Sequence, residues 1–262
     1  MTATVTAEKS VNKIELEQKV KDMYEQVARD PFGEFHFELG RALAERLGYA
    51  PGDLDRIPRE AVDSFAGVGY HFDLATIEPG ETVLDLGSGS GMDSFIAALR
   101  NGANGKVLGV DMTDAQREKA ERLRDRDGFT RISYHKAYIE HTPFADNSID
   151  AVISNGVINL AADKTAVFRE AARLLKPGGR LAISDIITEK ELPEGVTCNA
   201  TLWAACIGGA LQQDRYTDAI RAAGLRLVAL RSNPQYRFLT ASAQKACATY
   251  GVKSASLLAI KD

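Results

Sequence analysis

The first 75 residues carry apolar positions at a helical period. Between Val11 and Leu47, four apolar residues recur every three to four positions: Val20, Met23, Tyr24 and Val27. The turn sequence at residues 30–33 interrupts this pattern, which resumes at Phe35, and a shorter helix is predicted for residues 58–65. Residues 1–75 are therefore predicted to form an N-terminal helical cap on the substrate side.

From residue 80 onward, short apolar runs alternate with amphipathic segments. Five apolar runs bounded by turn residues are predicted to be buried strands: residues 82–86, 106–111, 132–135, 151–154 and 180–184. Helices are predicted at residues 93–100, 163–175 and 115–126, the last capped by Asp114. Because strands that alternate with helices need crossover connections, the sheet is predicted to be parallel.

The last part of the chain departs from this alternation. Helices are predicted at residues 199–211, 217–223 and 241–250, and strands at residues 226–230 and 255–261. The two late strands are expected to add an antiparallel edge. The predicted fold is thus α/β: a mostly parallel seven-stranded sheet flanked by helices over residues 76–262, with a substrate-side insertion around residues 190–215.

Composition and charge narrow the possible partners. A formal net charge of −4 favours neither nucleic acid nor an anionic membrane surface. No apolar run approaches the roughly 18–20 residues of a membrane span, and the polar first ten residues do not resemble a secretory signal. The cysteines Cys198, Cys206 and Cys247 show no spacing suited to zinc, so we expect a reducing, cytoplasmic location and no metal site.

A glycine-rich loop joins the first predicted strand to the next helix, with the sequence Asp85-Leu86-Gly87-Ser88-Gly89-Ser90-Gly91-Met92-Asp93. Glycines permit a sharp turn and let a ligand approach the N–H groups at a helix start. Asp111 ends the following strand about 20 residues later, where its carboxylate would accept hydrogen bonds from two ribose hydroxyls. The predicted nucleoside-binding residues here are Asp85, Gly87, Ser88, Gly89, Gly91 and Asp111.

Three details favour S-adenosylmethionine over a dinucleotide as the ligand of this loop. Asp85 stands before the first glycine, where a carboxylate attracts a methionyl ammonium group and repels a pyrophosphate. Met92 occupies the place of the usual third dinucleotide glycine. Residues 174–181 look like the sequence that precedes the fifth strand of class I methyltransferases. A nicotinamide or flavin enzyme and a glycine-rich turn without a ligand remain alternatives.

Residues after the later strands are expected at the same edge of the sheet, because ligands of such sheets bind beyond the carboxyl ends of the strands. Ile139 and Met112 would cover the two faces of adenine, and Glu140 would accept a hydrogen bond from its exocyclic amine. Asn155 follows the fourth strand and is either beside the transferred methyl group or a turn residue that opens a loop.

Several segments resemble arsenite S-adenosylmethionine methyltransferases. The matching runs are residues 83–89, 109–113, 153–160, 166–170, 179–187, 202–211 and 250–254. The resemblance covers about three quarters of the chain, from Asp63 to the C-terminus. It implies a Rossmann-like class I methyltransferase fold, S-adenosylmethionine as the cofactor, and a small-molecule acceptor.

The chain departs from that family at the cysteines that bind trivalent arsenic, a soft centre suited to thiolates. The family pattern places cysteines where this chain has Val68 and Gly156, and no cysteine precedes Cys198. Only Cys206 falls on a family cysteine position. Since one thiol cannot make a three-sulfur site, the sequence argues against arsenite as the natural acceptor.

The acceptor pocket is predicted from residues in and beside the helical cap, with the variable segment around Cys206 closing it. Tyr24 is expected to contact both the cofactor and the acceptor, and His36, Tyr70 or His71 to act in catalysis, a histidine as general base. The alternative is that the neighbouring phenylalanines are helix-packing core and that both histidines are exposed or satisfied by local hydrogen bonds. The predicted substrate pocket comprises Tyr24, His36, Tyr70, His71, Asn159, Trp203 and Cys206.

The sequence thus predicts methyl transfer from S-adenosylmethionine to a small organic molecule or thiol, on C, O, N or S. Ubiquinone-type C-methyltransferases share the cofactor core, so chemistry like theirs stays open. Arsenite methylation is one alternative, and a non-catalytic S-adenosylmethionine-binding protein is another. A homodimer is compatible with this reading.

Overall fold

The computed structural model describes residues 12–197, 203 and 207–262. Its centre is a twisted sheet in the order β3-β2-β1-β4-β5-β8-β7, with β6 paired to the end of β5. The strands are β1 (Thr82–Leu86), β2 (Lys106–Asp111), β3 (Ile132–Lys136), β4 (Ile149–Asn155), β5 (Leu175–Thr188), β6 (Leu211–Gln212), β7 (Leu225–Ser232) and β8 (Lys253–Lys261). This confirms the predicted sheet; β6, which begins at the last residue of the predicted 199–211 helix, adds an eighth strand.

The pairing is parallel from β3 to β5 and antiparallel from β5 to β7. The predicted antiparallel edge is therefore confirmed. The strand order reverses between β1 and β4, so the chain leaves β1 on one side and returns on the other. Such a switch point opens a crevice at the carboxyl ends of the strands, which is where α/β sheets bind ligands.

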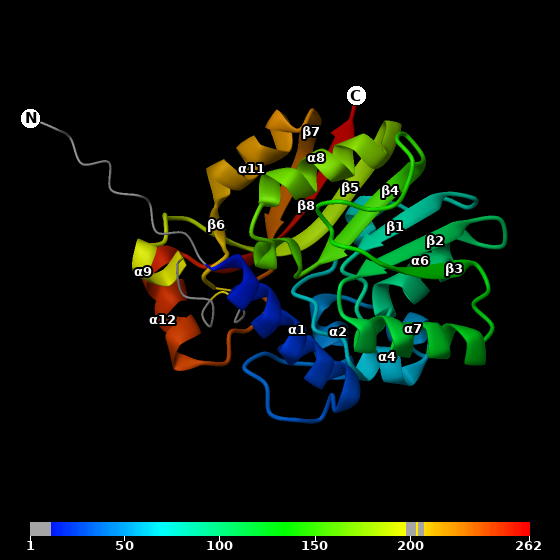
Figure 1. The fold of residues 1–262 in the computed structure, drawn as a ribbon, viewed down its shortest axis with the longest axis horizontal. Coiled ribbons are helices and arrows are strands. Elements are labelled where there is room, and N and C mark those ends of the chain that lie inside the picture. The colour runs from blue at the N-terminus through cyan, green and yellow to red at the C-terminus, as the bar shows by residue number, and fades with distance from the viewer. Residues whose placement is uncertain (1–11, 198–202, 204–206) are drawn as a thin grey trace, which may run out of the picture.

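Helices cover both faces of the sheet (Figure 1). The helices are α1 (Lys13–Arg29), α2 (Arg41–Leu47), α3 (Pro51–Leu54), α4 (Arg59–Asp63), α5 (Phe72–Ala75), α6 (Met92–Asn101), α7 (Asp114–Arg126), α8 (Lys164–Leu174), α9 (Glu194–Thr197), α11 (Gln213–Ala222), α12 (Ala241–Tyr250) and the 3-10 turn η1 (Ile158–Leu160). One face packs against α8 and α11, and the other against α6, α7 and the short helices α2 to α5.

Successive strand residues point to opposite faces, and the core shows this directly. Val83 packs with the α6 side of the sheet, and Leu84 packs with the α8 side. Leu43 and Phe72 of the N-terminal segment share the first of these clusters with β1 and β4. The segment before residue 75 therefore shares its core with the sheet, and the division at residues 75 and 76 stays a prediction.

Three local predictions were wrong. The second helix begins at Arg41 rather than at Phe35, because Gly40 has a positive φ of 84° and ends the irregular segment before it. Asp114 is the first residue of α7 and not its cap: Thr113 has the cap position, and the Asp114 carboxylate pairs with Lys136 at 2.6 Å. The predicted 199–211 helix falls partly outside the described residues, and β6 occupies its end.

No helix in the described part of the chain is long and apolar enough to cross a bilayer.

Candidate functional site

The glycine loop makes the tight connection between β1 and α6. Gly87, Gly89 and Gly91 have φ values of 73°, 52° and 95°, a region that side-chain-bearing residues rarely adopt. At Gly87 an added Cβ would also stand 2.5 Å from the Val157 side chain, and at Gly91 it would overlap the Tyr134 hydroxyl. At Gly87 and Gly91 glycine is thus required by both the backbone and the space around it, and at Gly89 by the backbone.

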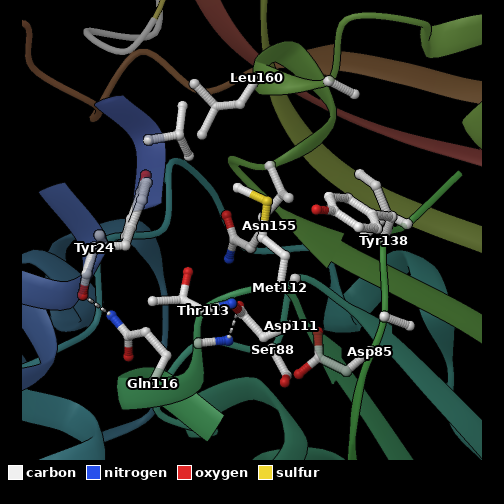
Figure 2. A pocket seen from close by; sticks show the side chains of 18 of the residues that line it. Tyr24, Asp85, Ser88, Asp111, Met112, Thr113, Gln116, Tyr138, Asn155 and Leu160 are labelled. Atoms are coloured by element: carbon white, nitrogen blue, oxygen red, sulfur yellow. Dashed lines mark hydrogen bonds between the residues drawn. The ribbon is translucent and has the colours of Figure 1, made fainter. Parts of the chain in front are cut away.

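A cavity of about 480 Å³ opens at this loop, within the roughly 300–1,000 Å³ of small-molecule sites. Figure 2 shows side chains from the ends of β1, β2 and β4 facing side chains of α1 across it. Ten of the predicted cofactor residues line this cavity: Tyr24, Asp85, Gly87, Ser88, Gly89, Asp111, Met112, Ile139, Glu140 and Asn155. The eleventh, Gly91, lies just outside the lining as the cap residue of α6.

Asp111 is held in place by backbone donors. Its Oδ1 accepts a hydrogen bond from the Thr113 N–H at 2.8 Å, and its Oδ2 accepts one from the Gly89 N–H at 2.9 Å. Each carboxylate oxygen has a second lone pair, so both oxygens can still accept a donor from the cavity. Burial raises the pKa of this carboxyl group. The geometry suits a vicinal diol such as a ribose.

A second acidic centre lies deeper, where Asp85 and Asp93 face the same cavity. Asp85 accepts a hydrogen bond from the Ser94 hydroxyl at 2.6 Å, and burial followed by the charge of Asp93 raises its pKa to about 8. Asp93 accepts one from the Tyr49 hydroxyl at 2.6 Å. A bound ammonium group would relieve the repulsion between these carboxylates.

Asn155 ties the fourth strand to the segment before β1. Its Oδ1 accepts hydrogen bonds from the N–H groups of Val68 at 2.8 Å and Gly69 at 3.2 Å. Its Nδ2 lies 3.0 Å from both the Gly69 carbonyl and Asp93. The side chain therefore fixes a loop from the N-terminal segment against the cavity, a role that neither sequence alternative included.

Helix α1 covers the cavity from the opposite side. The Gln116 amide of α7 donates to the Tyr24 carbonyl at 2.9 Å, as Figure 2 shows, and the buried Lys119 ammonium donates to the Ala28 carbonyl at 3.0 Å. Nearer the start of α1, the Tyr138 hydroxyl donates to Glu17 at 2.6 Å. These contacts hold α1 over the cavity at both ends.

The predicted catalytic residues His36, Tyr70 and His71 do not line the cavity, which corrects the prediction that they face the acceptor. His71 is fully buried and stacked on Phe72, and burial lowers its pKa. The Tyr70 hydroxyl accepts a hydrogen bond from Arg100 at 2.8 Å, and the His36 ring meets Phe37 edge-on. Phe72 is in the core, as the alternative held, but His71 is buried beside it rather than exposed, and His36 and Tyr70 are half-buried.

Two further pocket predictions also lie off the cavity. Asn159 and Trp203 are buried behind its wall, where the indole N–H donates to the Asn159 carbonyl at 2.9 Å. Cys206 lies outside the described residues. The described residues contain no cluster of three His, Cys, Asp or Glu side chains that could hold a metal ion.

The structure also adds lining residues that the sequence reading did not assign. Asp93 was part of the quoted loop motif, yet its role appears only when Tyr49 and Asn155 meet it. The apolar positions predicted in the first helix indicated that it has an apolar face, but they did not show what that face covers. The newly assigned lining residues include Leu16, Val20, Phe65, Asp93, Leu160 and Ala161.

Comparisons with known proteins agree with this geometry. Residues 77–224 match the family model described as a methyltransferase domain. An arsenite methyltransferase of Halobacterium salinarum is 39% identical over 185 residues, which are 71% of this chain and 47% of that protein. The chain spans about half the length of the curated relatives it matches.

Two solved structures extend the comparison. An arsenic (III) S-adenosylmethionine methyltransferase from Chlamydomonas reinhardtii is 30% identical, with a TM-score of 0.65 over 86% of this chain and 75% of that chain. A geranyl diphosphate C-methyltransferase from Streptomyces coelicolor, bound to S-adenosyl-L-homocysteine, is 17% identical with a TM-score of 0.69 over 94% of this chain and 98% of that chain, so it shows the fold alone. The chain belongs to the class I S-adenosylmethionine-dependent methyltransferases, and among them to those of the arsenite methyltransferase type.

Proposed function

We propose that this protein transfers the methyl group of S-adenosylmethionine to a small-molecule acceptor bound under α1. The observation that carries the proposal is the single cavity in which Asp111, the glycine loop and the paired Asp85 and Asp93 face an apolar helix. Asp111 suits the ribose, the carboxylate pair suits the ammonium, and the glycine loop brings its backbone to the edge of the cavity.

The side chains have three tasks in this proposal. When bound, the cofactor supplies an activated methyl group. Asp111 and Asp85 orient the donor, and Asn155 holds the segment from Val68 to Gly69 at the reacting end. Helix α1 excludes water and completes the wall against which an acceptor can be aligned about 3–3.5 Å from the methyl carbon. No histidine of the described chain lines the cavity, so the acceptor is either a nucleophile in its own right or loses its proton to a lining carboxylate, tyrosine or lysine.

The proposal is tested by binding and turnover together. Calorimetric titration should give micromolar affinity for S-adenosyl-L-homocysteine and none for NAD or FAD. Incubation with methyl-labelled S-adenosylmethionine and a panel of phenols, amines, thiols and quinols should transfer label to at least one acceptor. Tight binding without transfer to any acceptor would favour the non-catalytic alternative, and NAD binding would contradict the proposal.

Arsenite methylation is a second candidate, favoured by the names of the relatives and opposed by the side chains here. Val68 and Gly156 stand at two family cysteine positions, and a Cβ at Gly156 would lie 3.2 Å from Val68 Cγ1. The two positions are thus adjacent, and neither carries sulfur. We expect negligible dimethylarsenate from arsenite and glutathione; robust production would make arsenite the acceptor.

The adjacency allows a sharper version of this test. Replacing both residues, Val68→Cys with Gly156→Cys, should create arsenite affinity, which calorimetry can measure, whereas Val68→Cys alone should not. Because Gly156 has a φ of 75°, its substitution also costs about 1 kcal/mol of stability, and Gly156→Ala serves as the control for that cost.

A cytoplasmic location and a homodimer remain predictions.

A further inference from the structure

One wall of the cavity is apolar and comes from three separate parts of the chain. Helix α1 contributes one face, the segment before β1 a second, and the η1 turn with the residues after it a third (Figure 2). The apolar or aromatic residues of this wall are Leu16, Val20, Tyr24, Ala61, Phe65, Ala66, Leu160, Ala161 and Ala162. This wall offers an acceptor contact surface and few hydrogen-bonding groups.

Six carboxylates line the cavity: Asp85, Asp93, Asp111 and Glu140 on the opposite wall, and Glu17 and Asp163 beside the apolar wall. The partners of Asp85, Asp93 and Asp111 are hydroxyls, an amide and backbone N–H groups. None of the four carboxylates on the opposite wall forms an ion pair with a lysine or arginine of the described chain, whereas Glu17 pairs with Lys21. Among the described lining residues Lys13 is the one basic side chain, and it is exposed. The cavity is therefore strongly negative before any ligand enters.

The methyl donor does not neutralise this charge. S-adenosylmethionine carries a sulfonium, an ammonium and a carboxylate, hence one net positive charge. Even with Asp85 protonated, Asp93, Asp111 and Glu140 face that single charge. An anionic acceptor would add a further negative charge to a site of low dielectric, where like charges repel strongly.

A cationic acceptor is disfavoured for a different reason. The four carboxylates lie on the donor side, where the proposed ribose, adenine and ammonium contacts use them. The acceptor side, formed by Val20, Tyr24, Phe65 and Leu160, lies beside two further lining carboxylates, but Glu17 is already paired with Lys21 and Asp163 accepts a hydrogen bond from the Ala166 N–H. No carboxylate without a partner is therefore available there to compensate a buried cation next to the sulfonium. Binding of either an anionic or a cationic acceptor against this wall is therefore unfavourable.

We infer that the acceptor is a neutral, mainly apolar organic molecule with one nucleophilic atom, and that the apolar wall selects it. This inference rests on the proposed methyl transfer and names its substrate class. It goes further than the resemblance, because it follows from the charges and the apolar side chains that line this cavity.

The test uses three probes that share the indole ring and differ in charge: indole is neutral, indole-3-acetate is an anion and tryptamine is a cation. Their binding to the full chain saturated with sinefungin, an analogue whose charged amine replaces the sulfonium, is measured by calorimetry and ligand-observed NMR. We expect indole to bind at least tenfold more tightly than either charged probe. Equal or tighter binding of indole-3-acetate or tryptamine would overturn the inference, as would the absence of indole binding at millimolar concentration.

A matched pair of variants locates the binding. Val20→Ala removes part of the wall and should weaken indole about fivefold, while Ile14→Ala, on the same helix but 82% exposed, should leave it unchanged. Equal effects of the two variants would place indole elsewhere and contradict the inference. The affinity of the same proteins for S-adenosyl-L-homocysteine is measured separately. If the wild-type protein does not bind it, the proposed function itself is wrong. If it binds normally but a charged probe also binds, only the inferred acceptor class is wrong.

Discussion

The donor side of the cavity is built by one short stretch of chain, whereas the acceptor side is assembled from parts far apart in sequence. Between Asp85 and Asp111 a strand, a glycine turn, a helix and a second strand supply most of the donor contacts. The acceptor wall joins α1, the segment around Phe65 and the η1 turn at Leu160. Backbone geometry dominates the first side, and side-chain packing dominates the second.

This difference explains why the two sides respond differently to substitution. A glycine with positive φ or an N–H that holds Asp111 can be replaced only with strain. An apolar side chain in the acceptor wall can be exchanged for another of similar volume at a cost below about 1.5 kcal/mol. The donor side is thus constrained by the fold, while the acceptor side is free to change its specificity.

Among the substitutions that test this contrast between the two sides, Gly91→Ala is expected to lower the stability of the protein most. The positive φ of 95° costs about 1 kcal/mol, and overlap with the Tyr134 hydroxyl adds about 2 kcal/mol. The melting temperature should fall by on the order of 10 °C. Gly224→Ala, where φ is 84° and nothing lies within 4 Å of an added Cβ, is the control and should lose about a third as much. Equal losses would show that crowding at the loop is unimportant.

A smaller change in stability is expected from substitution in the acidic centre formed by Asp85 and Asp93. Burial and Asp93 raise the folded-state pKa of Asp85 from 3.8 to about 8, so the folded protein keeps a proton that the unfolded chain releases. The free energy of unfolding of the ligand-free protein should therefore decrease as pH rises from about 4 to about 8. Asp85→Asn should flatten this decline and raise the melting temperature at pH 8 by roughly 5 °C.

The same variant should weaken S-adenosylmethionine binding. The Asp85 carboxylate would then lower the stability of the ligand-free protein while increasing its affinity for the cofactor. Circular dichroism melting curves between pH 4 and pH 9 provide the measurement. Parallel curves for wild type and Asp85→Asn would mean that Asp85 does not titrate in this range.

The smallest effect is expected where α1 meets the adenine side. Tyr138→Phe removes the hydrogen bond to Glu17 but leaves the ion pair between Glu17 and Lys21. Because these side chains are partly exposed, the contact is worth about 0.5 kcal/mol, and cofactor release should accelerate two- to threefold. Stopped-flow release of S-adenosyl-L-homocysteine measures this, with Tyr250→Phe of α12 as the control. An unchanged rate would mean that this contact does not limit release.

The sequence predicted the donor side well because its signals are local. A strand, three glycines and an acid at the next strand end are read along one segment, and Asp111 lies where that spacing placed it. The acceptor side was predicted poorly, because His36 and His71 are polar residues in aromatic surroundings, and sequence alone does not show whether such a ring faces a cavity or a core. The bonds from Asn155 to residues 68 and 69 depend on tertiary packing and have no local signal.

The central claim is that the Asp111 carboxylate binds the ribose of S-adenosylmethionine. Calorimetric titration of Asp111→Asn tests it most directly, with Asp114→Asn, an exposed acid three residues later, as the control. Loss of two charge-assisted hydrogen bonds worth at least about 2 kcal/mol together should weaken binding by about 30-fold or more, while the control stays within twofold of wild type. An Asp111→Asn protein that melts like wild type and binds S-adenosylmethionine with unchanged affinity would contradict the account.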